Sequence, residues 1–124
     1  MKFLLDVNAL IALKHTRSPH HQSCRRWAAK QGIDSLATCA LTDLGFIRVS
    51  MAAFGVSLAD AQKDLADLKG KIAGFVEKCP SPFLPVDTPT AAKTTDAYLM
   101  QLAKAAGIQL ATFDTGIAGA ILIH

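Results

Sequence analysis

Apolar and polar residues alternate along the chain in blocks that predict strands and helices in turn. The run Lys2–Asp6 is short, apolar and ends in a carboxylate, as expected of a strand buried on both faces. Apolar residues recur at helical spacing over Val7–His15, and the later segment Leu41–Phe54 is apolar almost all round. A helix of this second kind is either central in a core or shared with another subunit. In so small a chain we favour a shared surface.

Capping and turn residues complete this outline. Ser18 and Pro19 predict the start of a helix that runs to about Lys30, where Gln31-Gly32 stops it. The remaining predicted segments are a strand at Ser35–Thr38, a helix capped by Ser57 that runs towards Ile72, a loop at Cys79–Pro82, an extended segment at Phe83–Val86, a helix from Thr94 or Thr95 to Ala106 ended by Gly107, a strand at Ile108–Thr112 and an edge strand at Ala120–Ile123. Strands that alternate with helices predict one three-layer α/β/α domain over residues 1–124, with a central, mainly parallel sheet.

The composition agrees with a single folded domain. Of the 124 residues, 51% are hydrophobic and 19% are charged, which excludes an intrinsically disordered chain. The longest apolar runs, such as Val7–Leu13, fall far short of the roughly 20 residues that cross a bilayer. No secretory signal is visible either, so we expect a cytoplasmic protein without a membrane partner.

The charge pattern is compatible with a polyanionic partner. The net charge is +3, and the stretch Lys14–Lys30 contains five basic residues and no acid. It is either a solvated helix face or a surface that receives phosphates. The three cysteines lack CxxC spacing, which favours reduced packing thiols. His20 and His21 would point about 100° apart on a helix, so a histidine metal site is not expected.

Four aspartates are candidate metal ligands. In open parallel sheets, ligands bind beyond the carboxyl ends of the strands. Asp6 closes the first predicted strand and Asp114 follows the late strand by two residues, so both should lie at that edge. Asp96 falls in the first turn of its helix and Asp43 near the start of the apolar helix. Each of these acids, taken alone, is also explained as a helix cap, a dipole partner or a solvated side chain.

Convergence of these carboxylates would require a cation. Two unit charges about 4 Å apart repel by roughly 4 kcal/mol at an effective dielectric of 20. A divalent ion reverses that balance, and hard oxygen ligands select Mg²⁺ or Mn²⁺ over zinc. The resulting hypothesis is hydrolysis of a phosphodiester without a covalent enzyme intermediate.

Four segments resemble the signature blocks of PIN-domain proteins, and the likeness is greatest to VapC-type toxins of toxin–antitoxin pairs. The segments are Leu5-Asp6-Val7-Asn8-Ala9-Leu10, Thr42-Asp43-Leu44-Gly45-Phe46-Ile47-Arg48-Val49, Thr95-Asp96-Ala97-Tyr98-Leu99 and Ala111-Thr112-Phe113-Asp114. They occur in family order and span nearly the whole chain. His20-His21 with Trp27 also resembles a feature of that group's second helix.

The resemblance implies a Mg²⁺- or Mn²⁺-dependent endoribonuclease that restrains growth by cutting RNA. It also implies a homodimer and a cognate antitoxin that plugs the acidic groove. Asp6 and Asp96 would be the principal metal ligands, Asp114 would complete the pocket, and Asp43 would stand where the family usually has Glu. The missing methylene shortens the reach of Asp43 by about 1.5 Å, so a bridging water could be needed. Thr115 stands where many relatives carry Arg.

Three other functions are compatible with parts of this pattern. A PIN-like fold without activity would serve as an RNA-binding or protein-docking module, and Asp43 supports that interpretation. A phosphotransfer receiver domain also clusters acids on a parallel sheet, but it needs paired acids early and a late lysine that this chain lacks. A phosphatase with an Asp-x-Asp nucleophile is disfavoured because residue 8 is Asn.

Overall fold

The centre of the molecule is a five-stranded sheet in which all neighbouring strands are parallel. The computed structural model describes residues 1–124. The strands are β1 (Phe3–Leu5), β2 (Leu36–Cys39), β3 (Gly74–Val76), β4 (Gln109–Thr112) and β5 (Ile121–Leu122). Their order is β3-β2-β1-β4-β5, which places β1 in the middle. This order differs from the 2-1-3-4-5 order of flavodoxin-like receiver domains, so the receiver interpretation is wrong.

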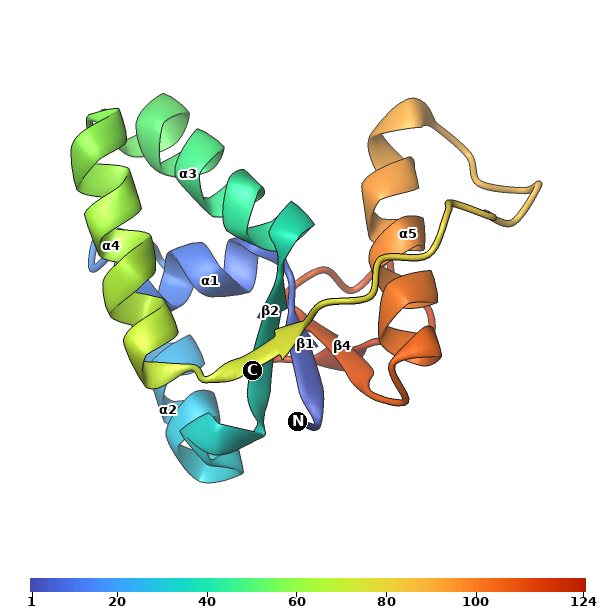
Figure 1. The fold of residues 1–124 in the computed structure, drawn as a ribbon, viewed down its shortest axis with the longest axis horizontal. Helices are drawn as coiled ribbons and strands as arrows, with labels where there is room; N and C mark the ends of the chain where they lie inside the picture. The colour runs from blue at the N-terminus through green and yellow to red at the C-terminus, as the bar shows by residue number, and fades with distance from the viewer.

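Helices cover both faces of this sheet, which confirms the predicted three-layer α/β/α architecture. Figure 1 shows α1 to α4 on one side of the strands and α5 on the other. None of these helices is long and apolar enough to span a bilayer. Their bounds are α1 (Val7–Lys14), α2 (His21–Gln31), α3 (Ala40–Phe54), α4 (Leu58–Lys71) and α5 (Thr94–Ala105), with short 3₁₀ turns η1 (Ile33–Ser35) and η2 (Ala91–Lys93).

Alternation along β1 divides the core into two clusters. Phe3 and Leu5 belong to a cluster of 15 buried residues shared with α1 to α4. Leu4 points the other way, into a cluster of 8 buried residues that includes Leu99 and Leu102 of α5. The prediction of a first strand buried on both faces is therefore confirmed. Asp6 is the residue that directly follows this strand.

The apolar helix α3 is neither wholly central nor wholly exposed. Phe46 is completely buried in the larger cluster, and Gly45 packs so closely that an added Cβ would collide with the side chain of Val7 on α1. On the opposite face Leu44 is 61% exposed and Met51 is 41% exposed. The sequence prediction of an outward apolar face is consistent with these two side chains.

The segment Phe83–Val86, predicted to be extended, is not a strand of the sheet. Phe83 and Val86 are almost fully exposed, and their stretch pairs with no strand. The strand next to β2 is instead β3, where Gly74 lies opposite Ala37. A side chain at Gly74 would collide with the carbonyl oxygen of Leu36, so glycine permits the close approach of these two strands.

Two predicted helix caps are also wrong. The hydroxyl of Ser18 accepts a hydrogen bond from the N–H of His20 at 3.2 Å and so forms a local turn, and α2 begins only at His21. Thr94 donates its hydroxyl hydrogen to the carbonyl of Ala91 instead of capping α5. By contrast, Ser57 accepts from the N–H of Asp60 at 3.1 Å, which confirms the predicted cap of α4.

Candidate functional site

Strand register brings two of the candidate acids to one edge of the sheet. Leu5 at the end of β1 pairs with Ala111 of β4, and the N–H of Asp6 donates to the carbonyl of Ala111 at 3.2 Å. Asp6 and Asp114 therefore leave the sheet from adjacent strands at the same carboxyl edge. Asp96 lies in the first turn of α5, which covers the face of β1 and β4 opposite to α1.

Asp6 is held in place through both of its carboxylate oxygens. It is 6% exposed. Its Oδ1 accepts from the N–H of Ala9 at 2.8 Å, which makes Asp6 the N-cap of α1. Its Oδ2 accepts from the hydroxyl of Thr112 on β4. Asp6 therefore both caps α1 and belongs to the acidic cluster, and the two hydrogen bonds fix the orientation of its carboxylate.

Thr112 links the two strand ends, and it was not among the site residues predicted from the sequence. It is 1% exposed. While its hydroxyl donates to Asp6, the same oxygen accepts from the backbone N–H of Asp114 at 3.0 Å. The sequence did contain a signal for it: a hydroxyl residue in a buried strand, two positions before an acid. Because buried polar groups need hydrogen-bond partners, such a hydroxyl is expected to bond to a nearby acid. Thr112 therefore orients two of the candidate ligands.

Asp114 lies at the exposed side of the cluster. Its Oδ1 accepts from the N–H of Gly116 at 2.8 Å, and its Oδ2 lies 3.4 Å from the ammonium nitrogen of Lys93 in η2. The hydrogen bond from Gly116 and the charge of Lys93 hold the pKa of Asp114 below its usual range. Asp114 is therefore ionised at neutral pH, with Lys93 as a neighbouring cation.

The acids Asp6, Asp96 and Asp114 influence one another electrostatically. Burial raises the pKa of Asp6 above its usual value, and the charges of Asp96 and Asp114 raise it further, against the hydrogen bonds from Thr112 and Ala9. Burial also raises the pKa of Asp96, followed by the charge of Asp114, while Lys93 opposes the rise. Among the four candidate acids, these three are therefore the ones whose charges act on one another.

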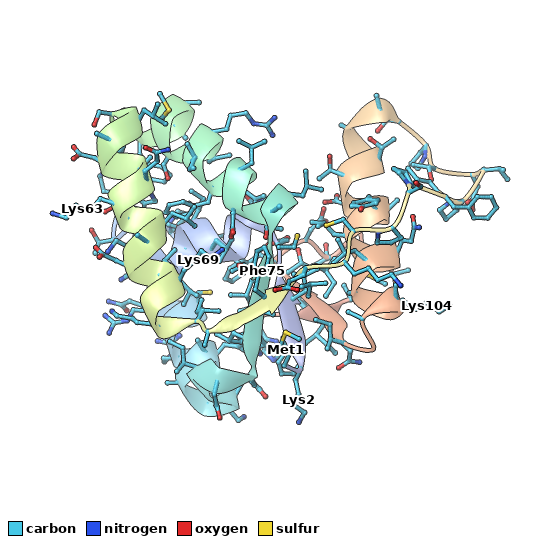
Figure 2. All side chains as sticks on the ribbon, viewed as in Figure 1. Met1, Lys2, Lys63, Lys69, Phe75 and Lys104 are labelled. Carbon is cyan, nitrogen blue, oxygen red and sulfur yellow. The ribbon has the colours of Figure 1, made fainter.

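Asp43 has a different neighbour. Its Oδ2 forms an ion pair with Lys69 of α4 at 2.6 Å, and the Lys69 ammonium also lies 4.1 Å from the ring centroid of Phe75 on β3. Figure 2 shows Lys69 and Phe75 directed towards each other between α4 and the sheet. Asp43 is not among the charges that act on Asp6. Its Oδ1 is buried and has no hydrogen-bond partner.

The donor chemistry of the three acids fits a hard divalent cation. Asp6, Asp96 and Asp114 offer only oxygen ligands, and Lys93 is the only cation whose charge acts on any of them. A divalent ion would relieve the repulsion that raises two of the pKa values. No three acidic, histidine or cysteine side chains lie close enough to hold a metal ion as they stand. Binding would therefore draw the carboxylates together.

The basic stretch predicted from the sequence divides into two parts. Lys14 forms ion pairs with Asp67 at 3.5 Å and Asp64 at 4.0 Å, both on α4. Arg25 and Arg26 remain exposed and line an open groove of about 850 Å³ along α2. The lysine is thus partly neutralised within the fold, whereas the two arginines keep their charge available to solvent.

The cysteines are free thiols, and the predicted packing role is confirmed for two of them and wrong for the third. Cys24 and Cys39 are buried, whereas Cys79 is exposed. Burial, with a smaller contribution from the charge of Asp6, raises the pKa of the Cys24 thiol to about 12. Cys24 is therefore an unreactive packing residue below the acidic cluster.

Sequence and structure comparisons give a consistent family. The model of the PIN domain matches residues 3–120. Ribonuclease VapC38 of Mycobacterium tuberculosis H37Rv is 37% identical over 123 residues, which cover 92% of this chain and 86% of that protein. Ribonuclease VapC44 of M. tuberculosis CDC 1551 is 34% identical over 127 residues, covering 95% and 89%. The crystal structure of PAE2754 from Pyrobaculum aerophilum superposes with a TM-score of 0.57 and 25% identity, covering 99% of this chain and 84% of that one.

Proposed function

The chain belongs to the PIN-domain family, and we propose that it is a VapC-type endoribonuclease that depends on Mg²⁺ or Mn²⁺. The proposal rests on one observation above all: paired strands β1 and β4 bring Asp6 and Asp114 to the same carboxyl edge of the sheet, where Thr112 bonds to both residues. The charge of Asp96 on α5 adds to the rise in the pKa of Asp6. The relatives named ribonucleases, which match over almost the whole chain, support the choice of RNA as substrate.

Each acid has a distinct task in this proposal. Asp6 and Asp96 are the principal ligands, and Asp114 completes the pocket. When bound, a divalent cation would supply charge neutralisation at the scissile phosphate and lower the pKa of a water molecule. Thr112 holds one oxygen of Asp6 and the backbone of Asp114, so the Asp6 carboxylate and the chain at Asp114 keep their positions before any substrate arrives.

Charges around the acids would guide the substrate. Lys93 is 46% exposed at its side chain and carries a positive charge to the cluster edge, where it could meet a phosphate of the substrate. Arg25 and Arg26 on α2 add positive charge along the neighbouring groove. The proposed action on RNA implies that the protein works in the cytoplasm.

We assign Asp43 the place of the family's glutamate. Its free Oδ1 atom is buried and lacks a partner, so it is available to a water molecule that bridges to the metal site. Lys69 keeps the other oxygen occupied. Replacement by the longer acid, Asp43→Glu, should therefore leave cleavage equal or faster, and a large loss of cleavage would reject this assignment.

A homodimer and a cognate antitoxin are part of the same proposal. Leu44 and Met51 lie one heptad apart on the exposed face of α3, where a second copy of the chain could cover them. Analytical ultracentrifugation should give a dimer for the native protein and a monomer for Leu44→Asp. A native protein that sediments only as a monomer at micromolar concentration would reject the dimer.

One observation favours a second function. Asp43 is already ion-paired with Lys69, and no three ligands stand together as the fold is. A PIN-like module without catalysis would therefore bind RNA or a protein partner through the same surface. This module would bind RNA in the presence of metal and never cut it.

The decisive experiment is cleavage of a labelled RNA by purified protein. Native protein should cut with Mg²⁺ or Mn²⁺ and stop when EDTA is added. Asp6→Asn and Asp96→Asn should remove cutting, because each deletes a charge at the proposed metal site while asparagine keeps the side-chain size. Asp87→Asn is the matched control, since Asp87 is an exposed acid in the β3–α5 loop. Full activity in Asp6→Asn and Asp96→Asn would overturn the proposed site.

A further inference from the structure

An aromatic pair joins the start of α2 to the residue that precedes Asp114. The imidazole of His20, directly before α2, stacks on the ring of Phe113 with a centroid distance of 4.4 Å and an interplanar angle of 21°. Phe113 is half-buried against the larger core cluster, whereas His20 is exposed. Phe113 therefore fixes one face of the imidazole while the rest of the ring reaches solvent.

Sequence neighbours connect this pair to the proposed site. Phe113 lies between Thr112, whose hydroxyl binds Asp6, and Asp114, whose backbone N–H binds Thr112. The ring stacked on Phe113 is therefore held by the residue that lies between two members of the acidic cluster in the chain. Residues Ser18, Pro19 and His21, which flank His20 in sequence, line the open basic groove along α2. His20 thus contacts the residue before Asp114 and is flanked in sequence by residues that line the basic groove.

His20 is the only histidine whose ring lacks a hydrogen-bond partner within the protein. His15 pairs with the hydroxyl of Ser50, His21 with the carbonyl of Ala12, and His124 with the carbonyl of Leu122. The rings of these three histidines are therefore already hydrogen-bonded within the protein. The ring of His20 makes no such contact, so its exposed surface is available to a ligand.

We propose that His20, supported by Phe113, is a stacking subsite for one base of a single-stranded RNA next to the cleaved phosphate. This inference deepens the proposed ribonuclease function and rests on it. An exposed aromatic ring beside positive charge is the usual platform for an unpaired base, because every base presents a π-face while the backbone follows the cations. Phe113 holds the imidazole in one orientation, which reduces the ordering needed on binding.

The competing explanation is that His20 only shields Phe113 from water. In that case a smaller residue at position 20 would lower stability and leave RNA binding unchanged. A third explanation is a contact between a protonated His20 and a phosphate. In that case RNA binding would be restored by a positively charged residue without a ring at position 20, and it would not be restored by an uncharged aromatic residue.

The test uses a short single-stranded RNA with one 2-aminopurine, whose fluorescence is quenched by stacking, and Ca²⁺ as a hard cation in place of Mg²⁺. The quench should appear on binding to the native protein for one position of the label. His20→Ala should remove the quench and weaken binding about 10-fold. His20→Phe should restore both. Phe83→Ala, which removes an exposed aromatic side chain in the β3–α5 loop, should behave like the native protein.

Several results would overturn the stacking subsite. They are an absent quench in the native protein, unchanged quench and affinity in His20→Ala, and rescue by His20→Lys but not by His20→Phe. Circular dichroism melts of each variant show whether the fold is intact. Because binding and quenching are measured without cleavage, a protein that stacks RNA and cuts none retains this subsite while the nuclease proposal fails. A protein that cuts RNA without stacking it retains the nuclease proposal while the subsite fails.

Discussion

Thr112 offers the sharpest test of how the fold positions the acidic cluster. Thr112→Val keeps the shape of a buried β-branched side chain and removes only the hydroxyl. The substitution deletes the hydrogen bond donated to Asp6 and the acceptor for the N–H of Asp114. Thr112→Ser is the matched control, because it keeps the hydroxyl and removes the methyl group instead.

The expected losses differ between these two variants. A hydrogen bond to an ionised group contributes about 1.5–3 kcal/mol, and the Asp114 N–H, which lies nearer the surface, adds about 0.5–1 kcal/mol. Thr112→Val should therefore lower the free energy of unfolding by about 2–4 kcal/mol. Thr112→Ser loses a buried methyl group and should cost about 1 kcal/mol.

The effect on the proposed metal site should be larger in Thr112→Val than in Thr112→Ser. The Thr112 hydrogen bond holds down a pKa of Asp6 that burial raises, so its loss lets that pKa rise further. A proton then competes with the metal up to a higher pH, and the acidic limb of the cleavage profile moves towards neutrality. Partners of metal-bound carboxylates typically change metal affinity by about 10- to 100-fold, which is the loss expected here.

Two measurements check this prediction. Urea unfolding gives the stability change, and calorimetric titration of Mn²⁺ without RNA gives the metal affinity. Thr112→Ser should bind Mn²⁺ nearly as well as the native protein despite its lower stability. Equal Mn²⁺ affinity in Thr112→Val and Thr112→Ser would refute the claim that this hydroxyl orients the ligands.

Three further outcomes are expected. Because the pKa values of Asp6 and Asp96 are raised in the folded state, the metal-free protein should lose stability as the pH rises from the ordinary carboxyl pKa of about 3.9 through the raised values. Urea unfolding in EDTA should show this decline, and saturating Mg²⁺ should remove it. Lys69→Met leaves the carboxylate of Asp43 buried without its partner and should cost about 1–2 kcal/mol, less than a fully buried pair because Lys69 is 36% exposed; an unchanged melting temperature would contradict this. Gly45→Ala should destabilise the fold by about 1–2 kcal/mol even though alanine favours a helix, because the new methyl group collides with α1; a more stable variant in thermal melts would show that α1 can move aside.

The strand ends were the part of the site that sequence could predict. A buried apolar run that closes with an acid occurs at Leu5-Asp6 and again before Asp114, and parallel strands present their carboxyl ends at one edge. The prediction that these acids lie at the same edge depends only on strand polarity. Their adjacency also needed the strand order, which local patterns do not contain and which the β1–β4 pairing provides.

The missed features depend on contacts between distant segments. β3 has three residues, too few for a periodic signal, and it is defined by pairing with β2 across Gly74. Ser18 accepts a hydrogen bond within a local turn and does not cap a helix, and the short-range chemistry of serine allows both. The pairing of Asp43 with Lys69 joins residues 26 positions apart and was invisible along the chain. Long-range partners thus account for what pattern analysis left out.

Binding of Mn²⁺ in the absence of RNA tests the central claim most directly. The account holds that Asp6, Asp96 and Asp114 form one electrostatically coupled site that needs a divalent cation. Titration followed by electron paramagnetic resonance should show saturable binding to the native protein and to Asp87→Asn, with affinity weakened at least about 10-fold in Asp96→Asn. Equal Mn²⁺ binding by all three proteins, or no binding by the native one, would contradict the account.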